Sequence, residues 1–197
     1  GLVHFTRACP GPWPGQGLAD YYESLVAGRE GAAHTAFDTL KRILAEGRLK
    51  ASGRLIRGSF PVISFTSNGP TGLANLVRWR RTWQRWTVEP YGLIISRKKL
   101  RTLGATPVIY GDGQTWSRLP PNQRYRFQMS SSGGQEWRAE KEWRLSGDLE
   151  LSLFASTELT IVLPSMREAE EISVTFGYPT LVLDPLTGPG APWRRKK

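Results

Sequence analysis

Cysteine and histidine are scarce in this chain, and long apolar runs are missing. Cys9 is the only cysteine among 197 residues, so a disulfide within the chain is impossible and a cysteine-rich zinc site is excluded. Cys9, His4 and His34 supply too few ligands for a structural metal site. No apolar run approaches the roughly 20 residues that a membrane span needs. The first residues also lack a signal-peptide pattern, so we expect a cytoplasmic protein with no membrane partner and no bound metal.

Acidic residues are also few compared with basic ones. The chain has 17 Asp and Glu against 27 Lys and Arg, which gives a net charge of +10. This balance favours contact with a polyanion, above all nucleic acid. The eight tryptophans fit the same partner, because aromatic rings can stack on unpaired bases. The alternative is that the charge only keeps the protein in solution. The length suits one domain, which we place at residues 1–188, followed by a basic tail at 189–197.

The order of predicted elements is typical of an α+β fold rather than of repeating βαβ units. An amphipathic helix is expected over 35–47, since Phe37, Leu40, Ile43 and Leu44 share one face and Gly47 can end the helix. A shorter helix is expected over 18–30, and a third over 72–87. The tract 111–135 is expected to be a long loop or lid. Strands are expected around His4 and over 61–66, 91–95, 106–111, 136–154 (as a pair), 158–164 and 180–184, with a helix over 165–173.

Two acidic residues alternate along one of these predicted strands. Glu140 and Glu142 are separated by Lys141, so the period-two geometry of a strand would place both carboxylates on the same face. Like charges so close destabilise a strand, which favours a functional reason for the pair. Fixed carboxylates can stabilise cationic charge that develops in a reaction. The alternative is a solvated strand face on which the acids pair with Arg138 and Arg144.

Three motifs in this order resemble the ADP-ribosyltransferase superfamily. The chain also resembles a loosely defined group of small bacterial abortive-infection proteins, which act in phage defence. The motifs of the first resemblance are His4-Phe5-Thr6, the segment Ser64 to Ser67, and Glu140 to Glu142; the second adds Tyr91-Gly92-Leu93, Pro107 to Tyr110, and Trp143-Arg144. The chain departs from the superfamily's Ser-Thr-Ser motif, because Phe65 stands before Thr66-Ser67 where the motif would have serine.

The resemblance implies a split, mostly antiparallel sheet with flanking helices and an active site that cleaves NAD as a substrate. Glu142 would stabilise the oxocarbenium-like transition state as nicotinamide leaves. Glu140 would orient or deprotonate the attacking group, and His4 would bind a ribose hydroxyl or the adenosine side of NAD. The remaining cofactor contacts implied are Phe5 and Thr6 on the first strand, Ser64, Thr66 and Ser67 as braces, Phe65, Tyr91 or Tyr110 as the nicotinamide stack, and Arg144 at the pyrophosphate.

The expected function is therefore that of an NAD-consuming toxin or anti-phage effector. Its acceptor would be DNA, RNA or a protein, and an antitoxin or a fused regulatory domain could control it. The alternative is a nucleic-acid-binding or nuclease-like effector without NAD chemistry. For that alternative, arginines are interleaved with Trp79, Trp83 and Trp86 on the predicted 72–87 helix. The tryptophans could equally pack the helix against the core. The arginines that would contact nucleic acid are Arg78, Arg80, Arg81 and Arg85.

Overall fold

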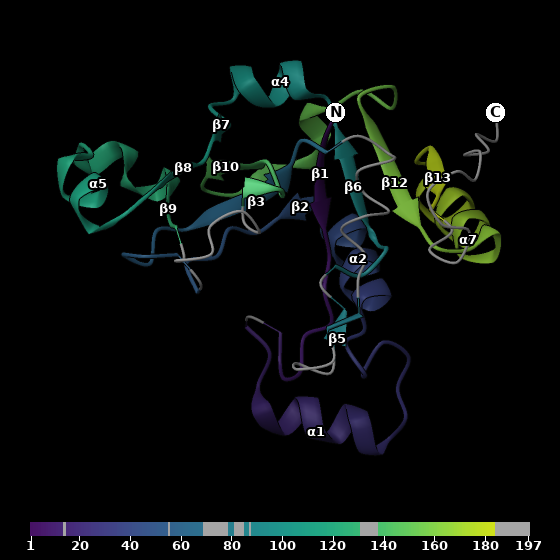
Figure 1. Cartoon of the computed structure of the whole chain (residues 1–197). Coiled ribbons are helices and arrows are strands. Elements are labelled where there is room, and N and C mark those ends of the chain that lie inside the picture. The colour runs from purple at the N-terminus through teal and green to yellow at the C-terminus, as the bar shows by residue number, and fades with distance from the viewer. Residues whose placement is uncertain are drawn as a thin grey trace.

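The computed structural model is built around one seven-stranded sheet (Figure 1). It describes residues 1–13, 15–54, 56–68, 88–130 and 138–183, and the backbone of 79–80 and 85–86. All neighbouring strands of the sheet are antiparallel except β12 and β13. The strands, in spatial order, are β13 (Thr180–Val182), β12 (Leu159–Leu163), β6 (Gly92–Ile95), β1 (Leu2–Phe5), β3 (Val62–Thr66), β10 (Glu142–Ser146) and β7 (Thr106–Pro107). The predicted α+β class and mostly antiparallel sheet are confirmed.

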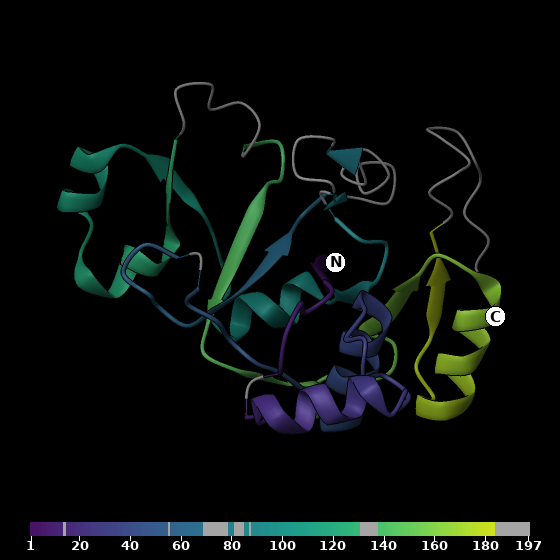
Figure 2. The same cartoon turned by 90° about the horizontal axis from the view of Figure 1, so that it is seen from below.

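The helices begin and end where the sequence supplies caps. α2 (Ala36–Glu46) starts with a capping box between Thr35 and Asp38, and it ends at Gly47, whose φ of 63° suits glycine. α7 (Met166–Phe176) starts at Ser165 and also ends at a left-handed glycine. In Figures 1 and 2, α7 lies beside β13 at one end of the sheet, and α5 (Gly113–Arg118) lies beyond the other end. The other described helices are α1 (Leu18–Val26), α4 (Arg97–Thr102), and the 3-10 helices η2 (Pro121–Arg126) and η3 (Leu151–Leu153).

The two faces of the sheet differ in chemistry. The register pairs Trp143 with Phe65 and Leu145 with Ile63, so these four side chains share one face and join the main apolar core. Leu40 and Leu44 of α2, together with Ala169 and Ile172 of α7, belong to the same core. The opposite face of the same strand pair is polar: it presents Ser64, Thr66, Glu142 and Arg144.

The centre of the sheet depends on one close backbone approach. β1 pairs with β6 over four residues, from Leu2 opposite Ile95 to Phe5 opposite Gly92. A Cβ atom at Gly92 would collide with the carbonyl of His4, so only glycine fits there. On its other side, β1 meets β3 at a single register pair, Val3 and Thr66. The junction between β1 and β3 is therefore the more open of the two.

Two predicted segments are corrected by the structure. Within 72–87 we expected a helix, but β4 (Trp79–Arg80) and β5 (Arg85–Trp86) form a two-stranded antiparallel pair with Trp79 opposite Trp86. Tryptophan favours strands, and here this preference outweighs the helical spacing of the tryptophans. The expected loop 111–135 contains α5, η2 and β9 (Phe127–Met129), and β9 pairs with β8 (Ile109–Gly111) in parallel. The short strands β2 (Arg48–Leu49) and β11 (Leu149–Glu150) form a further pair.

Candidate functional site

Glu142 is the most firmly held carboxylate of the polar sheet face. It begins β10, and its Oε1 accepts hydrogen bonds from the Ser64 hydroxyl and from Arg144 Nε, both at 2.8 Å. Arg144 Nη2 donates to its Oε2 at 3.2 Å. The Glu142 side chain is 16% exposed, against 2% for that of Arg144. The carboxylate is therefore fixed in position, in a side chain that keeps part of its surface exposed.

Arg144 is completely engaged within the protein. Its guanidinium has five N–H donors, and each has an acceptor in the structure. The acceptors are both oxygens of the Glu142 carboxylate, the carbonyls of Tyr125 and Phe127, and the amide oxygen of Gln128. The expectation that Arg144 meets a pyrophosphate is therefore wrong, because no donor remains for a phosphate oxygen. Arg144 instead positions Glu142 and ties the 106–129 segment to β10.

The end of β3 clamps the turn that precedes Glu142. The Thr66 hydroxyl donates to the carbonyl of Glu140, and the Ser67 hydroxyl donates to that of Lys141 at 3.1 Å. Asn68 Nδ2 donates to the carbonyl of Ala139 at 2.9 Å. Hydroxyl and amide side chains at positions 66–68 thus fix the entry into β10. Asn68 is a part of this clamp that the sequence analysis missed, although it directly follows the Ser-Phe-Thr-Ser motif.

Contrary to the expectation from the sequence, Glu140 does not share a strand face with Glu142. β10 begins only at Glu142, and Lys141 has a φ of 47°, which interrupts the alternation of an extended strand. Glu140 therefore lies in the turn before the strand. The two carboxylates are neighbours in sequence, but they are presented by different backbone conformations.

Tyr110 is the aromatic residue that the structure brings to Glu142. It lies on β8 and is partly buried. Burial, followed by the negative charges of Glu142 and Glu140, raises the pKa of the Tyr110 hydroxyl. The Arg138 guanidinium lies 5.9 Å from the centre of its ring. Of the three candidates for a nicotinamide stack, Tyr110 is therefore the one beside the carboxylate.

His4 lies on the other face of the sheet from Glu142, so the two side chains do not share one NAD site as the resemblance implies. Val3 is in register with Thr66, and Thr66 with Glu142, so Val3 rather than His4 shares the face of Glu142. The ring of His4 packs edge-on against Phe65, with 5.9 Å between the ring centres. Its Nδ1 donates to the carbonyl of Ser64 at 2.9 Å and bridges the open junction between β1 and β3. Burial lowers the pKa of His4, and this hydrogen bond opposes the effect.

The remaining predicted cofactor contacts serve the packing of the domain. The buried Thr6 hydroxyl donates to the carbonyl of Ala36 at the start of α2. Phe65 is 2% exposed in the main core, and Phe5 packs on a small second cluster formed by Val3, Val162 and Leu183. Tyr91 packs near Phe37, and its hydroxyl donates to Glu168 at 2.8 Å; burial and this bond raise its pKa.

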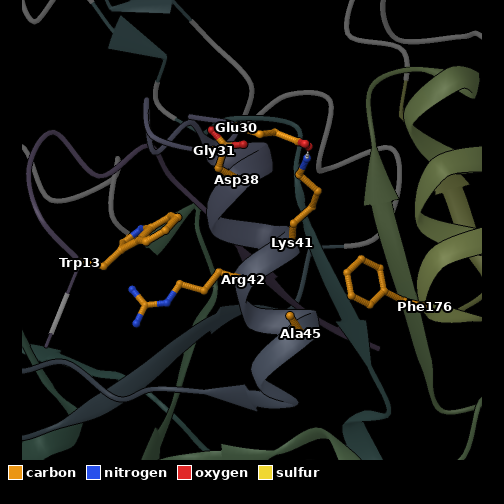
Figure 3. Close-up of a pocket in the computed structure, with 8 residues that line it drawn as sticks. All are labelled: Trp13, Glu30, Gly31, Asp38, Lys41, Arg42, Ala45 and Phe176. Atoms are coloured by element: carbon orange, nitrogen blue, oxygen red, sulfur yellow. Dashed lines mark hydrogen bonds and ion pairs between the residues drawn. The ribbon is translucent and has the colours of Figure 1, made fainter. Parts of the chain in front are cut away.

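A hollow of about 350 Å³ lies along α2, away from Glu142 (Figure 3). Its charged side chains are already paired: Lys41 contacts Glu30 at 3.1 Å, and Arg42 contacts Glu46 at 2.7 Å. One face of Trp13 stacks on His34 at 3.5 Å, and the Arg42 guanidinium lies 4.7 Å from the centre of the same ring. The two cations that line the hollow and its Trp13 ring are therefore already engaged within the protein.

Exposed cations gather on α4. Arg97, Lys98 and Arg101 are exposed and, with Thr102, line a second hollow of about 700 Å³. Within the described ranges, none of the three contacts a carboxylate. The side chains of the four arginines predicted to contact nucleic acid lie outside the described residues: Arg78, Arg80, Arg81 and Arg85.

Neither a metal site nor a relative helps to assign the chain. In the part of the chain that the structure describes, no group of three or more His, Cys, Asp or Glu side chains could hold a metal ion. No helix in those ranges has the length and apolarity to cross a membrane. Searches of protein-family models, curated proteins and solved structures found nothing that matches. The functional proposal therefore depends on the geometry around Glu142.

Proposed function

We propose that the protein is an ADP-ribosyltransferase-like effector in which Glu142 stabilises the positive charge that forms as NAD loses nicotinamide. The acceptor would be nucleic acid or a protein associated with it. The observation behind this proposal is the partly exposed Glu142 side chain, whose carboxylate Ser64 and Arg144 hold at 2.8 Å. A carboxylate held in advance can stabilise charge where it develops in the transition state without first having to reorganise.

The neighbours of Glu142 fit this chemistry. Tyr110 provides an aromatic side chain beside the carboxylate and is the proposed partner of the nicotinamide or its ribose. Ser64 and the clamp formed by Thr66, Ser67 and Asn68 keep the start of β10 in place. His4 has no direct role in this proposal, since it lies on the opposite sheet face. It instead supports the junction of β1 and β3, next to Ser64.

The test is nicotinamide release from NAD by the purified protein, with and without DNA, RNA and cell extract. We expect Glu142→Gln to lower the release rate by about 10²–10³-fold, the usual effect of removing one preorganised electrostatic group. The component that stimulates release identifies the acceptor. No release by the unaltered protein under any of these conditions would refute the proposal.

Two control variants separate chemistry from folding. Glu150→Gln removes a carboxylate that pairs with Arg48 on the small β2–β11 sheet, and it should leave the rate unchanged. Tyr110→Phe keeps the ring and removes only the hydroxyl. It should weaken NAD binding less than Tyr110→Ala if the ring is the contact. Urea unfolding of each variant shows whether the altered chain is still folded when its rate is measured.

A second candidate function is nucleic-acid binding without NAD chemistry, which the exposed cations of α4 favour. Arg97, Lys98 and Arg101 have no carboxylate partner among the described residues and line one hollow. Binding of nucleic acid that weakens steeply with salt, with no nicotinamide release, would support this function in place of the first.

A further inference from the structure

A second group of arginines surrounds Trp116 of α5, which lies beyond the end of the sheet opposite to α7. The Arg57 guanidinium lies 4.7 Å from the centre of the Trp116 ring, and that of Arg124 lies 5.4 Å from it. Arg57 also lies 5.7 Å from the centre of the Phe127 ring, which packs edge-on against Trp116 at 5.3 Å. We call Arg57, Trp116, Arg124 and Phe127 the Trp116 cluster.

The arginines of this cluster are held by aromatic rings and not by acids. Asp112 is the only acidic residue from 105 to 130, and its carboxylate caps α5 by accepting from the amide and hydroxyl of Thr115 at 2.9 and 3.0 Å. The loop from 51 to 61, which contains Arg57, has no acidic residue. Among the described residues, no carboxylate forms an ion pair with Arg57 or Arg124.

This arrangement leaves guanidinium N–H groups available to an anion. A guanidinium that lies over a ring uses its face for that contact, and its N–H groups point outward in its own plane. Arg57 is exposed and makes no hydrogen bond to another described residue, whereas Arg124 uses only its Nε, which donates to the carbonyl of Leu119 at 3.2 Å. The exposed Arg118, at the end of α5, adds a third positive charge nearby along the chain.

We propose that the Trp116 cluster binds the phosphodiester backbone of a nucleic acid, with Arg57 and Arg124 each contacting a phosphate. Planar guanidinium groups match phosphate oxygens in pairs, and the rings fix the two arginines so that little side-chain freedom is lost on binding. The cluster shares no residue with the arginines predicted at 78–85 or with α4. It does not depend on NAD chemistry at Glu142, although Phe127 joins it to Arg144 through a hydrogen bond to the Phe127 carbonyl.

The test measures binding of the full chain to fluorescent single-stranded RNA, single-stranded DNA and duplex DNA of equal length, as a function of salt. On a single strand each phosphate contact contributes about 0.7 to the slope of log affinity against log salt, or about fivefold in affinity at 0.1 M salt. The double variant Arg57→Gln/Arg124→Gln should therefore bind about 25-fold more weakly, with a slope lower by about 1.4. The three probes distinguish which nucleic acid supplies the phosphates.

Three matched variants make the result specific. Arg57→Lys/Arg124→Lys keeps both charges and should leave the salt slope unchanged, but it loses the planar groups stacked on the rings and should bind more weakly than the unaltered chain. Arg29→Gln/Arg48→Gln removes the same charge from two arginines already paired with Glu23 and Glu150, and it should bind almost as the unaltered chain does. Lys98→Gln/Arg101→Gln removes two positive charges from α4. An equal loss in the first Gln variant and the paired-arginine control, a loss confined to the α4 variant, or no binding at 50 mM salt would overturn the proposal.

Discussion

The two faces of the β3–β10 strand pair bury side chains by different means. On one face, Phe65, Trp143 and Leu145 enter the apolar core beneath α2 and α7. On the other, a full positive charge is buried: Arg144 is 1% exposed and is satisfied by five acceptors. The apolar face gains stability from area removed from water, whereas the polar face must first recover the cost of desolvating two charges.

This difference teaches that the polar face is built for position more than for stability. A buried ion pair is weak evidence for stability, because apolar residues of similar volume often do as well. Here every donor of Arg144 is matched, and the result is a carboxylate held in one place on a partly exposed Glu142 side chain. The predictions below compare the two faces, beginning with the largest expected change.

The largest effect is expected for Arg144→Met. Methionine fills part of the volume, but it leaves the Glu142 carboxylate without its guanidinium and removes the donors that Arg144 supplies to the carbonyls of Tyr125 and Phe127. Breaking one side of a buried pair costs about 3–5 kcal/mol of unfolding free energy. Urea unfolding at neutral pH measures it. A loss below about 1 kcal/mol would mean that the polar network is open to water.

The sequence predicts the apolar face of the sheet much better than the polar one. Alternation in β3 and β10, together with the helical stripe of α2, identifies the core residues because burial follows period two and period 3.6. The partners of Arg144 come from Tyr125, Phe127 and Gln128, in a segment expected to be a loop. No local pattern connects those residues to β10. The positive φ of Lys141 is likewise invisible in an alternating Glu-Lys-Glu motif, and so Glu140 was assigned to the wrong face.

The strand register also decides what two distant motifs can do together. The resemblance places His4 and Glu142 at one site because their motifs occur in the expected order. That order does not determine the register of each strand or the sheet face on which each side chain lies. A single pair, Val3 opposite Thr66, sends His4 to the core side. A shift of one residue in β1 would have placed it on the same face as Glu142, two strands away, because alternate residues face opposite sides.

On the apolar face, Leu145→Ala provides the matching test. Leu145 is 4% exposed and lies opposite Ile63, so its removal leaves a cavity in the main core. The expected loss is about 2–5 kcal/mol of unfolding free energy. The unfolding free energy of the variant should depend on salt concentration as that of the unaltered chain does, since no charge is involved. A salt-dependent loss would show that this face is coupled to the polar network.

A smaller effect is expected from the titration of His4. Burial lowers its folded pKa, so the unfolded chain binds the proton more readily, and stability should fall as the pH drops below the ordinary histidine value near 6.5. One proton gives a slope of at most about 1.4 kcal/mol per pH unit. His4→Asn keeps an N–H donor for the Ser64 carbonyl and cannot titrate in this range. The difference between the two unfolding curves from pH 7.5 to 5 should show this slope, and parallel curves would contradict it.

The smallest effect is expected for the exposed counterpart of the Glu142–Arg144 pair. Arg29 and Glu23 are joined at 3.0 Å, close to the 2.8 Å of the buried pair, but their side chains are 60% and 69% exposed. Water already solvates both charges, so Arg29→Met should change the unfolding free energy by no more than about 0.5 kcal/mol, and added salt should remove even that. The same arginine-to-methionine change at positions 29 and 144 thus compares a buried guanidinium that has five acceptors with an exposed one that is paired with Glu23. If both variants lost the same stability, the difference between the polar sheet face and the surface would lie in something other than desolvation.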